Sequence, residues 1–373
     1  MNKIFWHSQP TISRDDINVV TRQLTDKQIS FGSATRSFEA KIAEYVGARH
    51  ALATVNGTQA LYMALKILGC KKGDEVINPS YVCANLLNAV IKAECTPVLC
   101  DVDNFWVMGT KQVKKVITSK TKAIIAVNAM GIFCDIPELS KFNIPVIEDA
   151  CQNFGGILKG KKAGNHGIVG VYSFHAIKCL TTGEGGMALT NRKDFYDKLV
   201  MFRSHGITRD CGKLVNKKMP RWFYEMQFLG FNYRITDIQC ALGISQLKKL
   251  NRFVALRKAI VERYKEAFGG IAGISCLAER PYAKSSWHIF PILVKNGRDK
   301  IFEKLMTKNI GVNLHYIPIY LHPYYKKLGY KKGLCPMAEK YYREAITLPL
   351  YPSMSDNEVR RVISVTKTVI NSL

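Results

Sequence analysis

Short apolar runs alternate with helical patterns over the first two thirds of the chain. The runs are rich in β-branched residues and lie between polar turns, at 75–77, 97–99, 123–127, 146–147 and 168–172. Around them, apolar residues recur every three or four positions, the spacing of an amphipathic helix, at 14–24, 35–45 and 58–68. Strands that alternate with helices predict an α/β fold with a mostly parallel central sheet covered on both sides.

A long helical pattern separates this part from the rest of the chain. Helical spacing over 238–250 leads into a second helix over 252–268, after which strands and helices alternate again. The clearest later strand is predicted at 287–293. We therefore expect a large domain with an N-terminal arm over residues 1–250 and a smaller C-terminal α+β domain over residues 251–373.

A lysine lies between an apolar run and a glycine-rich loop. The stretch reads Ser173-Phe174-His175-Ala176-Ile177-Lys178-Cys179-Leu180-Thr181-Thr182-Gly183-Glu184-Gly185-Gly186. Partial burial makes an amine lose its proton more easily, because desolvation disfavours the charged form. The neutral amine can then form a Schiff base, the linkage used with pyridoxal phosphate. Most lysines are solvated surface charges, so the interpretation of Lys178 depends on which other candidate functional residues accompany it in the sequence.

Two acids follow the predicted strand at 146–147. Ligand groups gather beyond the carboxyl ends of strands in open α/β sheets. Alternation along the strand sends Glu148 and Asp149 to opposite sides, and Asp149 is nearer the loop. Asp149 is therefore our candidate partner for a protonated pyridine nitrogen, with Gln152 as a donor to the ring hydroxyl. The alternative role for Asp149 is to cap the following turn.

A third candidate element is the helix that begins at Asn56, Gly57 and Thr58. A helix N-terminus offers free backbone N–H groups and the positive end of the helix dipole, which together bind phosphate. Ser173 is a second candidate phosphate ligand, from the strand before Lys178. An ordinary Asn or Thr N-cap is the alternative interpretation of the helix start.

These three elements, in this order, resemble the DegT/DnrJ/StrS family of sugar aminotransferases. The resemblance covers nearly the whole chain, and the block around Lys178 is its most specific part. Three further stretches also match, namely Gly230-Phe231-Asn232-Tyr233-Arg234-Ile235-Thr236-Asp237-Ile238-Gln239-Cys240-Ala241, His315-Tyr316-Ile317-Pro318 and Leu348-Pro349-Leu350-Tyr351-Pro352.

The resemblance implies an aspartate-aminotransferase-like fold, which is fold type I of the pyridoxal-phosphate (PLP) enzymes. It implies pyridoxal 5'-phosphate as the cofactor, alternating between its PLP form and its pyridoxamine (PMP) form. Lys178 would hold the cofactor covalently and act as the general base, Asp149 would bind the pyridine nitrogen and Gln152 the ring oxygen. A related branch of the family has histidine instead of this lysine and dehydrates sugars, so Lys178 argues against that branch.

The resemblance also implies the phosphate ligands and the assembly. Gly57, Thr58 and Ser173 would bind the cofactor phosphate. Asn232 would reach the phosphate of the cofactor in the other subunit, because members of the family share the site across a homodimer interface.

One position departs from the family pattern. Many members carry an aromatic residue that stacks on the cofactor, where this chain has Cys83, and Tyr81 lies two residues earlier. Either residue can contact the ring, and a small buried thiol is the alternative for Cys83. His315 and Tyr316 are candidates for the wall of the sugar pocket, with packing at a strand end as the alternative.

The predicted function is transfer of an amino group from glutamate or glutamine to a keto-sugar. The expected acceptor is a nucleotide-linked 3- or 4-keto-(6-deoxy)hexose, used in the biosynthesis of amino sugars and surface glycans. Two alternatives stay open from the sequence: a non-nucleotide keto-cyclitol as acceptor, or a regulatory protein that keeps the PLP fold without catalysis.

The net charge is unusual for such an enzyme, at 54 − 29 = +25. The basic residues are spread along the chain without a nucleic-acid-binding signature, so we expect no nucleic-acid partner and interpret them as a lysine-rich, basic surface. The field of such a surface would also attract a nucleotide diphosphate. No apolar run is long enough for a membrane span, and the first residues lack the apolar core of a signal peptide. Eleven scattered cysteines without a Cys-x-x-Cys pair predict reduced thiols, a cytoplasmic location and no metal site.

Overall fold

A seven-stranded sheet forms the centre of the larger part of the molecule, in a computed structural model that describes residues 4–372. Its order is β1-β9-β8-β5-β4-β2-β3, and every neighbouring pair is parallel except those of β9, which is antiparallel to β1 and β8. The predicted α/β class with a mostly parallel sheet is confirmed. The strands are β1 (His50–Thr54), β2 (Glu75–Pro79), β3 (Thr96–Cys100), β4 (Thr121–Val127), β5 (Val146–Asp149), β8 (Val169–Ser173) and β9 (Gly186–Thr190).

Alternate residues of these strands pack on two separate layers of helices. Ala51, Ala53, Met187 and Leu189 face one apolar cluster, which contains residues of α2 (Ser33–Val46) and α8 (Asp237–Phe268). Leu52 and its neighbours on the other face belong to the main core, with α3 (Gly57–Ile67), α4 (Asn85–Lys92) and α7 (Lys193–Arg203). This two-sided burial explains why the strands read as nearly continuous apolar runs.

The smaller part of the molecule is built on a three-stranded antiparallel sheet, β12-β14-β15. Its strands are β12 (Ile274–Cys276), β14 (Phe290–Val294) and β15 (Ala345–Leu348), and its helices are α9 (Arg298–Thr307), α10 (Pro323–Lys327), α11 (Pro336–Glu344) and α12 (Asp356–Asn371). The remaining elements are α1 (Arg14–Thr25), α5 (Thr110–Lys114), α6 (Ile136–Leu139), the 3₁₀ helices η1 (Ala129–Gly131), η2 (Ser140–Phe142) and η3 (Ile319–Leu321), and the short strands β6 (Ile157–Leu158), β7 (Lys161–Lys162), β10 (Ile207–Thr208), β11 (Glu225–Met226) and β13 (Ala283–Lys284).

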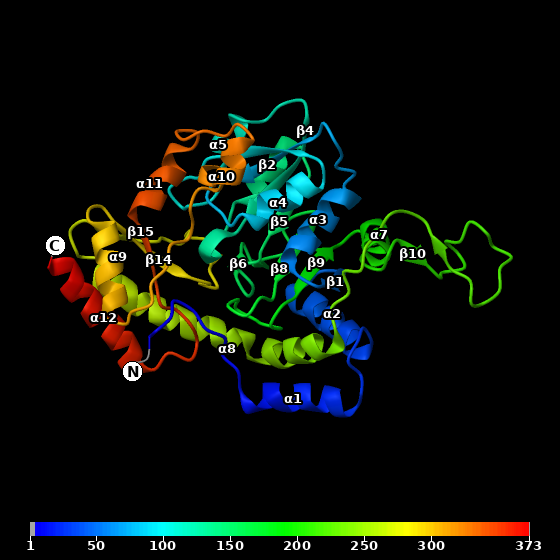
Figure 1. Cartoon of the computed structure of the whole chain (residues 1–373), viewed down its shortest axis with the longest axis horizontal. Coiled ribbons are helices and arrows are strands. Elements are labelled where there is room, and N and C mark those ends of the chain that lie inside the picture. Colours follow the sequence, from blue (N-terminus) through cyan, green and yellow to red (C-terminus); the bar gives the residue numbers. More distant parts are fainter. Residues whose placement is uncertain (1–3, 373) are drawn as a thin grey trace.

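The two predicted helices over 238–250 and 252–268 are one continuous helix. This helix, α8, runs along the lower side of the molecule from beneath α2 to α9 and α12 (Figure 1). The strand predicted over 287–293 begins three residues later than expected, at Phe290. Trp287 has a positive φ of 50°, which is incompatible with a strand, so the residues before Phe290 form the turn into it.

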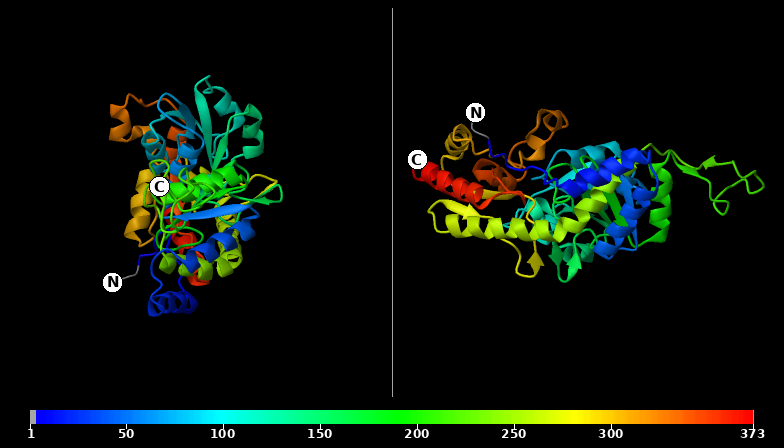
Figure 2. Two further views of the ribbon diagram at one scale, coloured as in Figure 1. Left: turned by 90° about the vertical axis from the view of Figure 1, so that its right-hand side faces the viewer. Right: turned by 90° about the horizontal axis from the view of Figure 1, so that it is seen from below.

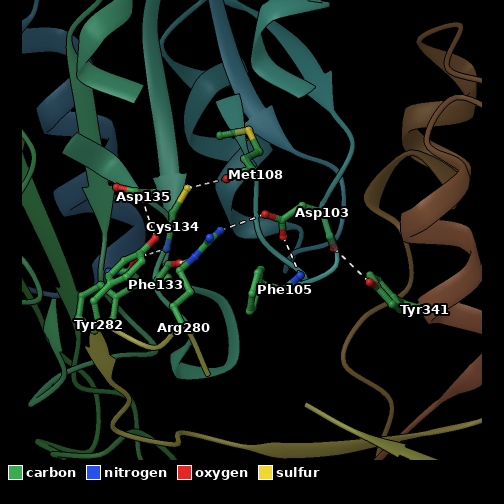
Figure 3. A network of polar contacts seen from close by, with 10 residues as sticks. Asp103, Phe105, Met108, Phe133, Cys134, Asp135, Arg280, Tyr282 and Tyr341 are labelled. Atoms are coloured by element: carbon green, nitrogen blue, oxygen red, sulfur yellow. Dashed lines mark hydrogen bonds and ion pairs between the residues drawn. The ribbon is translucent and has the colours of Figure 1, made fainter. Parts of the chain in front are cut away.

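The segment between β12 and β14 returns to the larger part of the molecule before the chain re-enters the smaller one. Arg280 donates through Nε to the carbonyl of Phe133 at 3.1 Å and through Nη2 to Asp103 Oδ2 at 3.0 Å, as Figure 3 shows. Tyr282 Oη donates to Asp135 Oδ2 at 2.9 Å in the same network. Strand β13 then pairs with β6, so this segment binds the two parts of the chain together.

A second long segment leaves the body of the molecule. The residues around β10 and β11 project from the large domain beyond α7 (Figures 1 and 2). This segment contains the stretch 211–222. Several large apolar side chains on the projection are exposed, including Trp222 at 70% and Leu229 at 69%. No helix in the described part of the chain has the length and apolar character that a membrane span requires.

The start of α8 is fixed to the start of α2 by one carboxylate. Asp237 Oδ1 accepts hydrogen bonds from Gly32 N at 2.8 Å and from Thr35 N at 2.9 Å, and Oδ2 accepts one from Ala34 N at 3.1 Å. The Thr35 hydroxyl also donates to Oδ1 at 2.6 Å. A Cβ at Gly32 would lie 2.7 Å from Asp237 Oδ2, so this position has to be glycine. The carboxylate supplies the acceptors that the first turn of α2 lacks.

We expect Asp237→Ala to destabilise the protein strongly, because it leaves several buried donors without an acceptor. The expected loss is about 3 kcal/mol or more, measured as a lower urea midpoint. Asp356→Ala is the matched control, since Asp356 is also the first residue of a helix after a capping box but is 77% exposed. The control should lose less than about 1 kcal/mol. Equal losses for the two variants would contradict the assigned role of Asp237.

Candidate active site

A cavity of about 400 Å³ lies beyond the carboxyl ends of β5 and β8 and beside the start of α3. Nine of the sequence-predicted residues line it, from both parts of the molecule: Gly57, Thr58, Cys83, Asp149, Gln152, Ser173, Lys178, His315 and Tyr316. Asn232 and Tyr81 do not line it. The carboxyl ends of two parallel strands and a helix N-terminus therefore meet at the residues that the sequence analysis predicted to form the site.

Two glycines allow the walls of the cavity to come together. A Cβ at Gly186 would lie 2.3 Å from the carbonyl carbon of Asn56, closer than any side chain tolerates. A Cβ at Gly57 would lie 3.1 Å from both the Tyr172 carbonyl and Ser173 Cβ. Gly186 pairs with Thr54 on one side and with Ser173 on the other. The antiparallel strand β9 thus holds the start of α3 against the end of β8.

The start of α3 has the features of an anion site. Asn56 is the N-cap, and its side chain accepts a hydrogen bond from Gln59 N at 2.9 Å. The N–H groups of Gly57 and Thr58, in the first turn, have no partner within the helix. The Thr58 and Ser173 side chains add two hydroxyl groups on the same cavity wall. Asn56 therefore acts as the N-cap, while the next two residues, Gly57 and Thr58, are the ones that can bind a phosphate.

Lys178 lies in a closed loop between β8 and β9. The loop is held at its base by hydrogen bonds from Phe174 N to the Gly185 carbonyl at 2.8 Å and from Thr182 N to the Phe174 carbonyl at 2.9 Å. Lys178 is half-buried and lines the cavity. Within residues 4–372, its amine forms no ion pair. The amine is therefore available to a ligand.

The two acids at the end of β5 have different partners, as strand alternation predicts. Glu148 accepts hydrogen bonds from Asn128 Nδ2 at 2.8 Å and from His166 N at 2.7 Å, which places it in a structural network. Asp149 lines the cavity instead. Burial raises the pKa of Asp149, while its hydrogen bonds with Cys151 and the charge of Lys178 lower it to a smaller extent. Among the described residues, the carboxyl of Asp149 forms no ion pair.

Gln152 and Tyr316 connect the two parts of the molecule across the cavity. Gln152 Oε1 accepts from Met130 N at 2.7 Å, and its Nε2 donates to Tyr316 Oη at 2.9 Å. The segment that returns after α8 supports this pair, because Ser286 N donates to the side chain of the adjacent Asn153 at 3.0 Å. The amide of Gln152 is thus oriented, with one of its two N–H groups left for a ligand.

His315 is held in the neutral state beside Tyr316. Its Nδ1 lies 3.0 Å from Thr347 Oγ1. Burial, with the nearby His7 and Lys178, lowers the pKa of His315 to about 3. The ring of His7, on the N-terminal arm, lies 5.3 Å from the ring of His315. A neutral imidazole in the wall presents a hydrogen-bonding group without adding charge.

The structure separates the two candidates for contact with the cofactor ring. The Tyr81 side chain is fully buried, with its ring 6.0 Å from Trp106 and 6.1 Å from Tyr341. Cys83 is exposed and lines the cavity. Of the two, only Cys83 is on the wall that a ligand would touch. Asn232 is exposed and forms a bridge with Ser204, outside the cavity of its own chain.

Among the residues of this region that sequence reasoning missed are Cys151 and His7. Cys151 lines the cavity, and its Sγ would lie 3.1 Å from a Cβ added at Gly57. Its place two residues after Asp149 was the available signal. His7 lies more than 300 residues from His315 along the chain, and no local pattern reveals that contact. No cluster of three or more metal-ligating side chains occurs within the part of the chain that the structure describes.

Known proteins resemble this chain over its whole length. A model of the DegT/DnrJ/EryC1/StrS aminotransferase family matches residues 10–367. The spore coat polysaccharide biosynthesis protein SpsC of Bacillus subtilis is 33% identical over 381 residues, with 99% of this chain and 98% of SpsC covered. The UDP-4-amino-4,6-dideoxy-N-acetyl-beta-L-altrosamine transaminase of Campylobacter jejuni is 32% identical, with 95% of each chain covered.

A solved structure also resembles this chain over nearly its whole length. Spr1654 of Streptococcus pneumoniae, assigned as a sugar aminotransferase and solved in its PMP form, has a TM-score of 0.91 at 29% identity. The match covers 98% of this chain and 99% of Spr1654. The aspartate-aminotransferase-like architecture expected from the sequence is confirmed.

We expect a bound cofactor to protect Cys83 from thiol reagents. Cys83 and Cys211 are the exposed cysteines of the described chain, and the others are buried or half-buried. Burial and the nearby Asp149 raise the pKa of Cys151 well above its ordinary value, so this second cavity thiol should react slowly. Peptide mapping after brief treatment with N-ethylmaleimide should find both exposed cysteines modified without pyridoxal phosphate, and Cys211 alone with it. Equal labelling of Cys83 with and without pyridoxal phosphate would exclude contact between Cys83 and the cofactor ring.

The buried carboxyl of Asp149 predicts a pH-dependent effect on stability. Its pKa is raised in the folded protein, so its ionisation opposes folding as the pH rises above 3.8, its ordinary value, through the raised value. Asp149→Asn should therefore raise the thermal midpoint of the cofactor-free protein at pH 7, and the gain should shrink as the pH falls toward 3.8. The exposed Asp356→Asn is the control, with no such trend expected. A lower midpoint for Asp149→Asn at pH 7 would refute this account.

Proposed function

The chain belongs to the DegT/DnrJ/EryC1/StrS aminotransferase family, and we propose that it transfers an amino group from glutamate or glutamine to a nucleotide-linked keto-sugar, with pyridoxal phosphate as cofactor. The observation that carries the proposal is the convergence of Lys178, Asp149 and the start of α3 on one cavity. The family and its named relatives are transaminases, so the remaining questions concern the cofactor, the acceptor and the donor.

The residues present fit pyridoxal phosphate. The first N–H groups of α3 and the hydroxyls of Thr58 and Ser173 suit a phosphate, and the absence of a Cβ at Gly57 keeps the helix start close to the end of β8. Asp149, which lines the same cavity, suits a protonated ring nitrogen. Lys178 offers an amine for a Schiff base. When bound, the cofactor supplies an electron sink that makes the carbon next to the amino group acidic.

The chain's own residues perform the remaining steps. The Lys178 amine, once free, takes the proton from the donor's carbon and returns one to the acceptor's carbon, since its loop holds it over the cavity. Asp149 would hold the protonated ring nitrogen. Gln152, oriented by Met130 N, has one N–H left that would donate to the ring oxygen. The second half-reaction, with the ketone, reverses the first at the same atoms.

The relatives support the choice of acceptor. The name of the Campylobacter jejuni relative places an amino group at carbon 4 of a UDP-linked 6-deoxy sugar, and we propose a nucleotide-linked 4-keto-6-deoxyhexose as the substrate of this chain. His315 and Tyr316 offer neutral hydrogen-bonding groups for its hydroxyls. The proposal keeps the homodimer with Asn232 at the partner's site, consistent with the exposure of Asn232 and its position outside its own cavity. A cytoplasmic location also stays a prediction.

The visible spectrum tests the proposal. The wild-type protein with pyridoxal phosphate should show a yellow absorption band that bleaches when L-glutamate is added, as expected for transfer of the glutamate amino group. Lys178→Ala should show an altered band that glutamate changes at least about a thousandfold more slowly, since the covalent link and the base are both lost. Lys340→Ala, an exposed lysine on α11, is the control and should behave as wild type.

The keto-sugar then completes the test. The bleached protein should regain its band when a UDP-linked 4-keto-6-deoxyhexose is added, and should not regain it with UDP alone. A protein that takes up no cofactor, or whose band never responds to glutamate or glutamine, would overturn the proposal.

A further inference from the structure

Lys92, the last residue of α4, lies against a cluster of aromatic rings. Its amine is 4.7 Å from the centre of the Tyr62 ring, 5.2 Å from that of Tyr233 and 5.5 Å from that of Phe231. It also donates a hydrogen bond to Tyr233 Oη at 2.8 Å. A cation within about 6 Å of the centre of an aromatic ring is attracted to the face of that ring. One amine therefore holds three rings, one from α3 and two from the segment 231–233.

Two of the three rings flank Asn232 in the sequence. The segment forms an antiparallel bridge at Asn232, and in extended backbone successive side chains point to opposite sides. Phe231 and Tyr233 therefore share one side, and their rings stack with centres 5.3 Å apart and planes 21° apart. Asn232 is on the other side and is exposed. Lys92 thus holds the side of the segment that is opposite to Asn232.

The backbone of the segment 231–233 is anchored to two helices. Phe231 N donates to the carbonyl of Phe202 in α7 at 3.0 Å. Tyr233 N donates to the Arg203 carbonyl at 3.0 Å, and the Tyr233 carbonyl accepts from Val55 N at 3.0 Å. Val55 directly precedes the N-cap of α3. The backbone bonds therefore attach the segment to α7 and to the start of α3, and Lys92 holds it through its side chains.

Lys92 also contacts the anion site of its own chain. Its amine donates to Gln59 Oε1 at 3.1 Å, and Gln59 N donates to the N-cap Asn56. Two routes thus lead from Lys92 to a phosphate: through Gln59 to the cavity of the same chain, or through Asn232 to a site outside it. The contacts favour the second route. The amine holds both rings beside Asn232, whereas the backbone of Gln59 is already fixed by the helix and its cap.

We propose that Lys92 is a positioning residue for Asn232, and that it orients this side chain toward the cofactor phosphate in the other subunit of a homodimer. The inference rests on the proposed function, in which two subunits share each site. Lys92 does not line the cavity of its own chain, so it acts through Phe231 and Tyr233. A ligand side chain binds more tightly when its neighbours hold it in the productive geometry before the ligand arrives. Without the amine, Asn232 should stay in place but bind the phosphate less tightly.

Hydrogen exchange tests the geometric part of the proposal without cofactor. In Lys92→Met, which keeps an unbranched side chain and removes the charge, the amides of Phe231 and Tyr233 should exchange about tenfold faster than in the wild type. Lys92→Arg should restore the slow exchange, because a guanidinium also binds aromatic faces. Lys114→Met, at the exposed end of α5, is the matched control and should leave these amides unchanged. Unchanged exchange in Lys92→Met would overturn the proposal.

Mixed dimers of differently tagged chains then show in which subunit Lys92 acts. Each dimer keeps one Lys178, so a single site gives the absorption of lysine-bound cofactor. In the first dimer, one chain carries Lys178→Ala and the other Lys92→Met. Its remaining site receives Asn232 from the chain with an intact Lys92 and should bind pyridoxal phosphate as tightly as the wild type. In the second dimer, one chain carries both changes and the other none. Its remaining site should bind about fivefold more weakly, a modest effect because Lys92 is exposed.

The pattern of affinities decides between the two routes. Weak binding in the first mixed dimer and normal binding in the second would assign Lys92 to its own α3 through Gln59, and would overturn the proposal. Equal affinities in the two dimers would also overturn it. Asn232→Ala, used in place of Lys92→Met in the same two pairings, should give the same order of affinities with a larger difference. If the wild type takes up no pyridoxal phosphate, the proposed function fails. If it binds the cofactor and only the Lys92 pairings show no difference, the role of Lys92 alone fails.

Discussion

The close approach of three backbone segments without intervening side chains is the constraint on which the active site depends. Gly186 of β9 lies against Asn56, and Gly57 lies against the end of β8 at Tyr172 and Ser173. Strand β9 runs antiparallel to both of its neighbours, so the loop between β8 and β9 reverses the direction of the chain beside these contacts. Lys178 lies in that loop. The lysine and the anion site are therefore fixed by the same contacts, and a methyl group at either glycine disturbs both.

The sequence predicts the parts of this arrangement that depend on local patterns. The buried strands read as apolar runs, and alternation along β5 separated Asp149 from Glu148, whose own partners are Asn128 and His166. The parts that it missed are contacts between distant residues. The antiparallel direction of β9, the pairing of β13 with β6 and the contact of His7 with His315 leave no periodic signal in one chain. Cys83 and Tyr81 lie on an irregular loop, where no alternation tells which side chain faces the cavity.

The large positive charge illustrates what composition leaves undecided. Lys92 lies over the rings of Tyr62, Phe231 and Tyr233 and donates to Tyr233 Oη at 2.8 Å, so it is a packing residue. Lys249 is paired with the buried Asp16 and fixes α1 on α8. Lys326 and Lys332, in contrast, form no ion pair with any residue in the range 4–372. Only the three-dimensional neighbours distinguish a lysine that supports the fold from one that is free for an anion.

Helix α8 gives the molecule a mechanical property that follows from its length. Its 32 residues span roughly 48 Å at 1.5 Å per residue. One end is anchored to α2 through Asp237, and the other reaches the small domain, so the helix acts as a lever arm. A tilt of one degree at the anchored end moves the far end by roughly 0.8 Å for that length. Such a displacement exceeds the tolerance of a hydrogen bond like that between Gln152 and Tyr316. The angle of α8 at its anchored end, far from the active cavity, therefore decides whether the two halves of the cavity align.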